Sequence, residues 1–180
     1  MTVEAFVAWA LSLEDPRFWE LHDGVAAQRP ASWWEDGLLK TDVLGQLWPA
    51  FEHDTEHEVF GPGLLVPVGP RTATEPHVTV VPRAGLDWDS PVVRDPLVVI
   101  EVPRRDARAE HWAPRLRAYA GLPSILHVVA VHPAARAALH LWRAEDGTIA
   151  GRFLRRGAIA LDPLPAALDL DALWARIDRR

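Results

Sequence analysis

A single carboxylate, Glu101, closes the most apolar stretch of the chain, and it could support chemistry there. Leu97 to Ile100 precede it and Val102 follows it. Such a run predicts a strand covered on both faces, where a carboxylate is costly to bury unless it meets a cation, a proton or a donor. Since α/β sheets carry their sites at strand carboxyl ends, Glu101 is our first candidate site residue. The alternative is an ordinary carboxylate that turns to solvent.

A cluster of arginines follows Glu101 closely in the sequence. Its members are Arg104, Arg105, Arg108, Arg115 and Arg117. Guanidinium groups grip phosphate in bidentate fashion, so the cluster predicts a local basic patch that could bind nucleic acid; the alternative is a solvated, charged turn and helix face. The net charge of −6 gives the whole chain no attraction for nucleic acid, so any such binding must be local. Among the 19 basic side chains Lys40 is the single lysine, which indicates a drift from lysine to arginine across the chain.

A second pattern with chemical content is His53-Asp54-Thr55-Glu56-His57. It has the H-x-x-E-H spacing of inverted zinc peptidases, in which a helix presents both histidines to the metal. Pro49 lies just upstream, strand-forming residues resume at Val59, and no third ligand is evident. We therefore interpret this segment as a polar loop between a helix and a strand.

Composition narrows the class of protein. A hydrophobic fraction of 49% in 180 residues predicts one globular domain spanning 1–180, with a sizeable core. The absence of cysteine excludes disulfides and thiolate metal sites. Residues 5–13 resemble a signal core, but Glu4 precedes them without any positive charge, which favours an amphipathic helix. No apolar run is long enough to span a membrane, so we expect no membrane partner and a cytoplasmic location.

The elements that must position Glu101 alternate between helix and strand patterns. Helices are predicted from Thr2 to about Leu13, from a capping box at 32–35 to about Pro49, over the segment ending at 119–120, and over 170–177. Strands are predicted at 18–21, 25–28, 64–68, 78–81, 97–102 and 124–131, and Asp146-Gly147 marks a hairpin between 137–143 and 148–154. The fold class is therefore α/β, with a mixed β-sheet flanked by helices and a C-terminal hairpin and helix.

Four of these segments resemble, in order and spacing, the motifs of a known family. They read FWELHDG at 18–24, EPHVTVV at 75–81, LVVIEV at 97–102 and RLRAYAG at 115–121. The chain resembles the Uma-type restriction endonucleases, a bacterial branch of the PD-(D/E)XK nuclease superfamily, over residues 18–177. The resemblance implies a restriction-endonuclease-like fold, DNA as the partner, and a homodimer.

The resemblance also implies metal-dependent hydrolysis of phosphodiester bonds. Clustered carboxylates hold Mg²⁺ or Mn²⁺, and the metal polarises the phosphate and activates a bound water. Glu101 would be one metal-binding carboxylate and Glu20 an accessory acid. His77 falls where the family has its aspartate ligand, and Arg115 falls where it has its lysine. The implied catalytic set is thus Glu20, His77, Glu101 and Arg115, with His77 and Glu101 as metal ligands.

The two exchanged residues change the expected chemistry. Imidazole suits zinc, copper or nickel better than Mg²⁺, so His77 removes a charged, hard ligand. Arg115 stays protonated and cannot accept a proton, although it can grip a phosphate. Drift from lysine to arginine accounts for Arg115 but not for His77. Two hypotheses therefore stand: a metal-dependent DNA endonuclease, and an inactive relative that binds DNA or a protein partner through Arg104, Arg105, Arg108 and Arg117.

Overall fold

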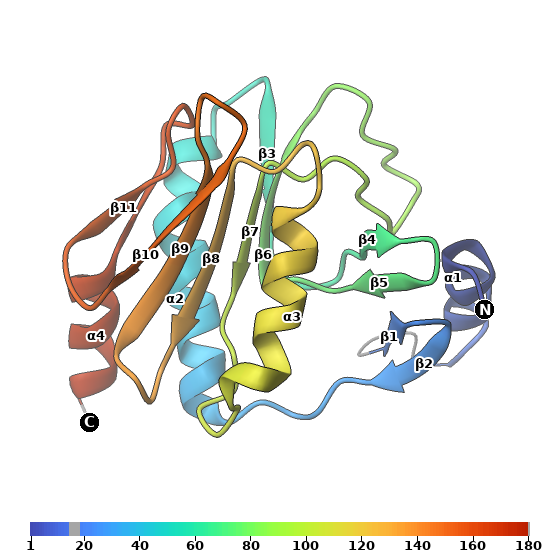
Figure 1. The fold of residues 1–180 in the computed structure, drawn as a ribbon, viewed down its shortest axis with the longest axis horizontal. Helices are drawn as coiled ribbons and strands as arrows, with labels where there is room; N and C mark the ends of the chain where they lie inside the picture. The colour runs from blue at the N-terminus through green and yellow to red at the C-terminus, as the bar shows by residue number, and fades with distance from the viewer. Residues whose placement is uncertain (15–18, 180) are drawn as a thin grey trace.

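A six-stranded mixed sheet forms the centre of the computed structural model, which describes residues 1–14 and 19–179 (Figure 1). Its strands, in the order in which they lie, are β10 (Ile149–Leu154), β9 (Ala137–Arg143), β8 (His127–His132), β7 (Val98–Glu101), β6 (Val78–Pro82) and β3 (His57–Phe60). Strands β7 and β8 run parallel and the other neighbours run antiparallel. The helix α3 (Ala109–Ala120) makes the crossover between the parallel pair.

Helices cover both faces of this sheet (Figure 1). The helices α2 (Trp34–Phe51) and α4 (Leu170–Asp178) pack on one face, where Val98 and Ile100 of β7 join their core. Helix α3 packs on the opposite face against Val99. Because side chains alternate along a strand, Glu101 points to the same side as Val99, toward α3. A small sheet of β11 (Ala158–Ala160) and β12 (Ala167–Asp169) lies beside α2 and α4.

A second, four-stranded sheet stands beside the first. Its order is β2 (Val25–Gln28), β1 (Trp19–His22), β5 (Thr72–Thr74) and β4 (Val66–Gly69). The helix α1 (Val3–Leu11) covers it through a separate cluster that includes Phe6 and Leu21. In this way β1 and the segment after β5 approach the carboxyl end of β7, so the two sheets together form the site.

The predicted fold class is confirmed, but several boundaries differ. Helix α2 runs past Pro49 to Phe51, since Phe51 is buried in the core with Leu47 and this burial offsets the hydrogen bond that proline cannot donate. The predicted capping box is wrong by one residue: Asp36, not Glu35, accepts from a preceding backbone N–H, that of Trp33. Strands β5, β11 and β12 were not predicted, because three-residue strands carry too little periodicity.

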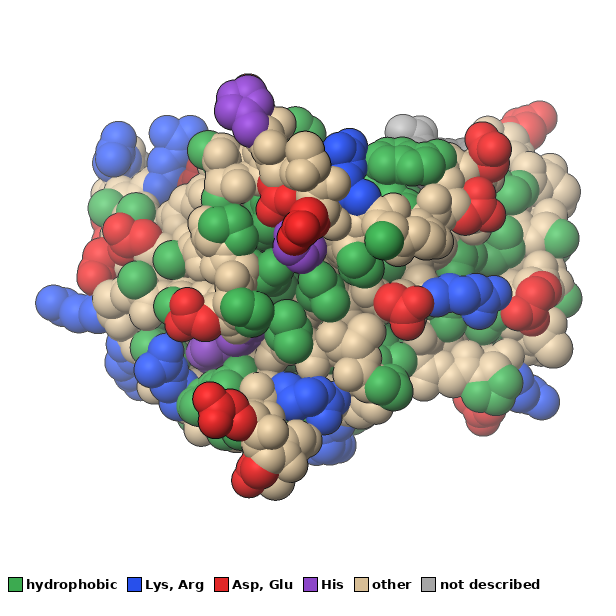
Figure 2. All heavy atoms as spheres, turned by 90° about the horizontal axis from the view of Figure 1, so that it is seen from above, with side chains coloured by type: hydrophobic (Ala, Val, Ile, Leu, Met, Phe, Trp, Pro, Cys, Tyr) green, Lys and Arg blue, Asp and Glu red, His purple; other side chains and the backbone are tan. Residues whose placement is uncertain are grey.

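Two predictions fall partly on residues that the structure does not describe. Asp15-Pro16, a pair that predicts the end of the first helix, and Phe18, the first residue of the strand predicted at 18–21, lie outside the described residues. Within those residues, no helix has the length and apolarity needed to cross a membrane. The face drawn in Figure 2 carries acidic and basic side chains interspersed with apolar ones, as expected for an acidic protein without a broad basic field.

Candidate functional site

Glu101 lies buried at the carboxyl end of β7 and meets three partners. Its Oε1 accepts hydrogen bonds from Nε of Arg115 at 2.6 Å and from the Tyr119 hydroxyl at 3.0 Å. Its Oε2 lies 2.5 Å from Nδ1 of His77. Arg115 and Tyr119 stand one turn apart on α3, so both reach the same strand end. The cation and donors that a buried carboxylate requires are therefore all present.

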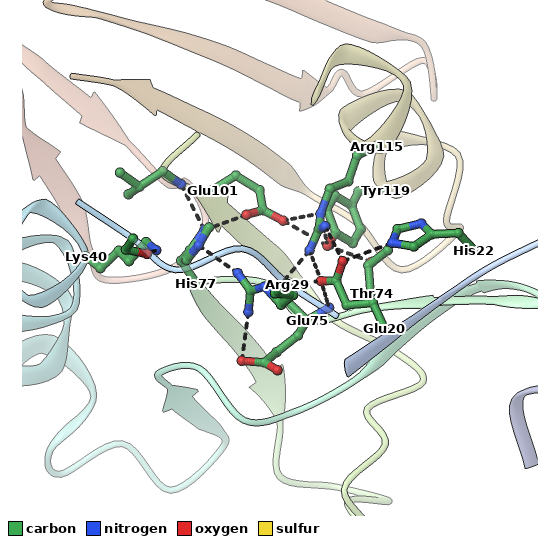
Figure 3. A network of polar contacts seen from close by, with 12 residues as sticks. Glu20, His22, Arg29, Lys40, Thr74, Glu75, His77, Glu101, Arg115 and Tyr119 are labelled. Carbon is green, nitrogen blue, oxygen red and sulfur yellow. Dashed lines mark hydrogen bonds and ion pairs between the residues drawn. The ribbon is translucent and has the colours of Figure 1, made fainter. Parts of the chain in front are cut away.

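The guanidinium of Arg115 lies among the acidic groups and binds oxygen atoms from three segments (Figure 3). Besides Glu101, it donates to both carboxylate oxygens of Glu20, at 2.8 and 2.5 Å, and to the backbone carbonyl of Glu75, at 2.9 Å. Its Nε also lies 3.2 Å from the Tyr119 hydroxyl. These contacts join β1, the segment after β5, β7 and α3 through one positive charge.

His77 connects Glu101 to a second guanidinium, that of Arg29. Its Nε2 lies 2.8 Å from an Nη of Arg29, and a guanidinium can only donate. His77 must therefore accept at Nε2 and carry its proton on Nδ1, where it donates to Glu101. The backbone N–H of Val102 lies 3.0 Å from the same Nδ1, and a protonated Nδ1 cannot accept it; the two contacts therefore compete, and the contact with the charged Glu101 is the shorter. Burial lowers the pKa of His77 more than the nearby Glu101 raises it, which agrees with a neutral imidazole.

Arg29 follows β2 and forms a second ion-paired layer. It binds Glu75 at 2.8 Å and approaches Glu20 at 3.6 Å. Burial raises the pKa of Glu75 although Arg29 opposes this effect. Burial would likewise raise the pKa of Glu20 and of Glu101, but their hydrogen bonds and the neighbouring arginines lower both, that of Glu101 to about 2. The carboxylates of Glu20 and Glu101 are therefore ionised and neutralised within the protein.

These groups form one wall of a cleft of about 900 Å³ between α2, α3 and the segment after β2. Lys40 of α2 lines the same cleft, and its ammonium donates to the Ser32 hydroxyl at 2.5 Å. Burial and the charge of Arg29 lower the pKa of Lys40. Within the described part of the chain no carboxylate lies within 4.0 Å of this ammonium, unlike the guanidinium groups of Arg29 and Arg115.

The residues present do not fit Mg²⁺ or Mn²⁺ in this arrangement. Such ions take oxygen ligands in a compact, nearly octahedral shell. Here the oxygens of Glu20 and Glu101 are bound to Arg115 and His77, and an imidazole replaces the expected aspartate. Among the described residues, no group of three or more His, Asp or Glu could hold a metal ion. The positive charge at this centre comes from Arg115.

The structure brings together the four predicted catalytic residues, which lie far apart in the sequence. Glu20, His77, Glu101 and Arg115 form one hydrogen-bonded network and all line the cleft (Figure 3). The predicted nucleic-acid-binding arginines are more dispersed. Their positions are as follows: Arg104 lines the cleft and pairs with Asp106, Arg105 pairs with Glu35, Arg108 approaches Glu110, and Arg117 lies exposed on α3. Their role in binding stays a prediction.

Several residues of the network were not found from the sequence. Arg29 is one of many arginines and follows an unremarkable strand, so no local pattern marks it. Glu75 belongs to a motif already recognised, yet only its tertiary position gives it a role. Lys40 could have been singled out from the sequence, because it is the only lysine in an arginine-rich chain. A tyrosine at the end of a helix, such as Tyr119, is more commonly a packing residue than a catalytic one; Tyr119 is indeed buried, but its hydroxyl also bonds Glu101.

Three histidines outside the cleft, His57, His127 and His140, make structural contacts. The segment 53–57 is a turn that enters β3, and Asp54 binds the His57 ring at 3.0 Å, so the interpretation as a polar loop is confirmed. His127 and His140 are buried and stacked, with Nδ1 of His127 2.9 Å from Nε2 of His140. The other nitrogen of His140 is buried and has no hydrogen-bond partner among the residues that the structure describes. A histidine within a strand is commonly a core or edge residue with its hydrogen bonds satisfied, which holds for His127 but not for His140.

The chain is similar to known proteins both in sequence and in fold. Residues 3–172 match the sequence model of the Uma2 family, which is described as "Putative restriction endonuclease". The fold is similar to the crystal structure of "a putative nuclease belonging to DUF820" from Anabaena variabilis, with a TM-score of 0.77 and 13% sequence identity over 98% of this chain and 99% of that one. At this identity the likeness shows a shared fold. None of the curated proteins matches the chain in sequence.

Proposed function

Because the chain belongs to the Uma2 family of restriction-endonuclease-like proteins, we propose that its cleft binds the phosphodiester backbone of DNA and that Arg115 replaces a divalent metal at the acidic centre. The observation that carries this proposal is the charge of the cleft. Four basic side chains line it, those of Arg29, Lys40, Arg104 and Arg115, against three carboxylates. Arg104 pairs with Asp106, which does not line the cleft, so the positive charge available to an anion is that of Lys40, whereas a metal centre needs uncompensated carboxylates.

Such binding is local, as the net charge of −6 requires. Lys40 is the contact that needs the least rearrangement, since no carboxylate in the described part of the chain pairs with its ammonium. Arg104 stands at the same cleft but is held by Asp106 in a bidentate pair, with contacts at 3.0 and 2.8 Å. Phosphate must compete with that pair, so we expect Lys40 to contribute more to affinity than Arg104.

Fluorescence anisotropy with labelled DNA in EDTA tests this function. We expect binding that needs no metal and that added Mg²⁺ does not strengthen. It should weaken steeply between about 50 and 200 mM salt because phosphate contacts release counterions. Absence of binding at low salt would remove DNA as the partner. Affinity that does not depend on salt would rule out backbone recognition.

Metal-dependent hydrolysis is the second candidate, and the convergence of Glu20, His77, Glu101 and Arg115 at the motif positions favours it. Plasmid nicking with Mg²⁺ or Mn²⁺ that Glu101→Gln abolishes would support this activity. A silent wild-type protein that gains activity as His77→Asp/Arg115→Lys would identify a decayed site instead. The homodimer implied by the family resemblance stays a prediction, which sedimentation equilibrium measures directly.

A further inference from the structure

The cleft has the size and the walls of a small-molecule site. Its volume of about 900 Å³ lies within the range of roughly 300 to 1,000 Å³ that ligand pockets occupy. Trp112 and Leu116 of α3 contribute one apolar wall, and prolines 30, 62 and 103 contribute others. The exposed backbone of a duplex needs only a shallow charged surface, so these walls provide more apolar surface than backbone contacts use.

The polar group best placed to receive an anion in this cleft is Lys40. Its ammonium carries three N–H donors, of which Ser32 takes one. The Ser32 hydroxyl lies 2.5 Å away and lines the same cleft, so it can contact the same anion. The guanidinium groups of Arg29 and Arg115 are already paired with carboxylates of the same wall. We therefore expect them to stabilise that wall rather than to bind the anion.

Trp112 offers a flat aromatic surface in the same cleft. It is half-buried, and its ring lies 6.2 Å from that of His132 at an angle of 51°, which supports it from outside the cleft. Within the described residues, its Nε1 has no hydrogen-bond partner. Aromatic side chains that line grooves are stacking platforms for bases, and a base must be unpaired or extruded to use them.

We propose that the cleft holds one unpaired nucleotide, with its phosphate on Lys40 and Ser32 and its base against Trp112. This inference rests on the proposed function and specifies it: the DNA unit recognised in the cleft is single-stranded or extruded from a duplex. Ammonium, hydroxyl and aromatic wall match the phosphate and base of one nucleotide, and the volume accommodates that unit.

Calorimetric titration of the wild-type protein with three probes tests the inference. The probes are deoxyadenosine 5′-phosphate, deoxyribose 5-phosphate, which lacks the base, and inorganic phosphate. We expect the nucleotide to bind at least about fivefold more tightly than the sugar phosphate, which is the lower end of base-stacking contributions. Equal affinities of the nucleotide and the sugar phosphate would show that the apolar wall does not bind the base, independently of the results for any variant.

Two variants with matched controls separate the two ends of the site. Lys40→Gln should weaken the nucleotide and the sugar phosphate alike, whereas Arg156→Gln, an exposed arginine outside the cleft, should weaken neither. Trp112→Leu should weaken the nucleotide and leave the sugar phosphate unchanged, and Trp88→Leu, at a tryptophan 62% exposed outside the cleft, should change neither. Losses at the controls equal to those at Lys40 and Trp112 would place the ligand elsewhere.

DNA binding distinguishes failure of this inference from failure of the proposed function. Single-stranded DNA should bind more tightly than duplex of the same length, and Trp112→Leu should remove that preference. The inference is overturned if duplex DNA binds as tightly as single-stranded DNA and the nucleotide binds no more tightly than the sugar phosphate. That result would leave binding of the DNA backbone intact. Failure of both kinds of DNA to bind overturns the proposed function itself.

Discussion

The Nε of Arg115 lies 2.6 Å from Oε1 of Glu101, joining a helix to the end of the strand that precedes it in the chain. The same guanidinium binds both oxygens of Glu20. A centre that resembles a metal site in its residue positions is thus neutralised by a covalently attached cation. This relationship makes the network a structural element as well as a wall of the cleft, and its consequences can be measured.

Removal of the Glu101 charge should destabilise the fold strongly. In Glu101→Gln the guanidinium of Arg115 and the Nδ1–H of His77 lose their charged acceptor inside the protein. Breaking a buried pair costs about 3 to 5 kcal/mol, so we expect the free energy of unfolding in urea to fall by about 3 kcal/mol or more. Glu110→Gln, at an exposed carboxylate on α3, is the control and should change it by under about 0.5 kcal/mol. Equal effects of the two substitutions would contradict a structural role of the network.

The Tyr119 hydroxyl should contribute through its hydrogen bonds rather than through packing alone. It accepts from the Thr74 hydroxyl at 2.7 Å and donates to Glu101. Tyr119→Phe keeps the ring but removes the acceptor of the Thr74 hydroxyl and one of the donors to Glu101, which should cost about 1 to 3 kcal/mol in urea unfolding. In a double-mutant cycle, Thr74→Val should cost less in the Tyr119→Phe background than in the wild type. Additive losses would show that the two hydroxyl groups do not interact.

Stability should fall in mild acid because of buried histidines. Burial, together with His127 and Arg152, lowers the pKa of His140 to about 4. The unfolded chain, with an ordinary histidine pKa of about 6.5, binds a proton that the folded chain does not. The contribution of His140 to the free energy of unfolding is therefore fully present above about pH 6.5. It is lost as the pH falls toward 4, by up to about 3 kcal/mol.

Urea unfolding between pH 7 and pH 4 measures this loss, and His140→Gln should reduce its slope. Burial lowers the pKa of His77 and of His127 as well, so part of the slope should remain. The exposed His53→Gln is the control and should leave the slope unchanged. A slope that His140→Gln does not alter would assign the acid sensitivity to other groups.

Divalent metals should not stabilise the wild-type protein. A ligand raises the melting temperature only when it binds the folded state, and the oxygens of Glu20 and Glu101 are occupied by Arg115 and His77. Melting curves with Mg²⁺, Mn²⁺ or EDTA should therefore agree within about 1 °C, a shift well below that of 1 kcal/mol. A melting temperature that Mn²⁺ raises in the wild type but not in Glu101→Gln would instead establish a metal centre and favour the hydrolytic candidate.

Lys40 should account for part of the salt dependence of DNA binding. Each phosphate contact contributes a slope of about −0.7 to −0.9 to the dependence of log affinity on log salt. Lys40→Gln should therefore weaken binding and make the slope shallower by about 1. Arg156→Gln is the matched control and should leave the slope as it is. An unchanged slope in Lys40→Gln would exclude this ammonium as a phosphate contact.

The sequence determined the main elements because their patterns are local. The apolar run ending at Glu101 predicted the central strand, and helical periodicity predicted α2 and α4, since burial repeats every two residues along a strand and about every 3.6 along a helix. Short strands such as β5 and β11 hold too few residues for any period, and pairing with a neighbour stabilises them. The turn at 53–57 was also predictable, because the sequence changes there from a helical to a strand pattern, although α2 extends past Pro49 to Phe51 and β3 begins at His57.

For the site, the sequence determined which side chains are present, and the fold decided what they contact. The motif order predicted that Glu20, His77, Glu101 and Arg115 belong together. It could not show that Arg115 binds the oxygens of Glu20 and Glu101, or that Arg29 reaches His77 from the end of β2. Nor could it show that Lys40 lines the cleft and pairs with no carboxylate in the described part of the chain. Charge compensation depends on distances of a few ångströms between segments far apart in the chain, and only tertiary packing sets those distances.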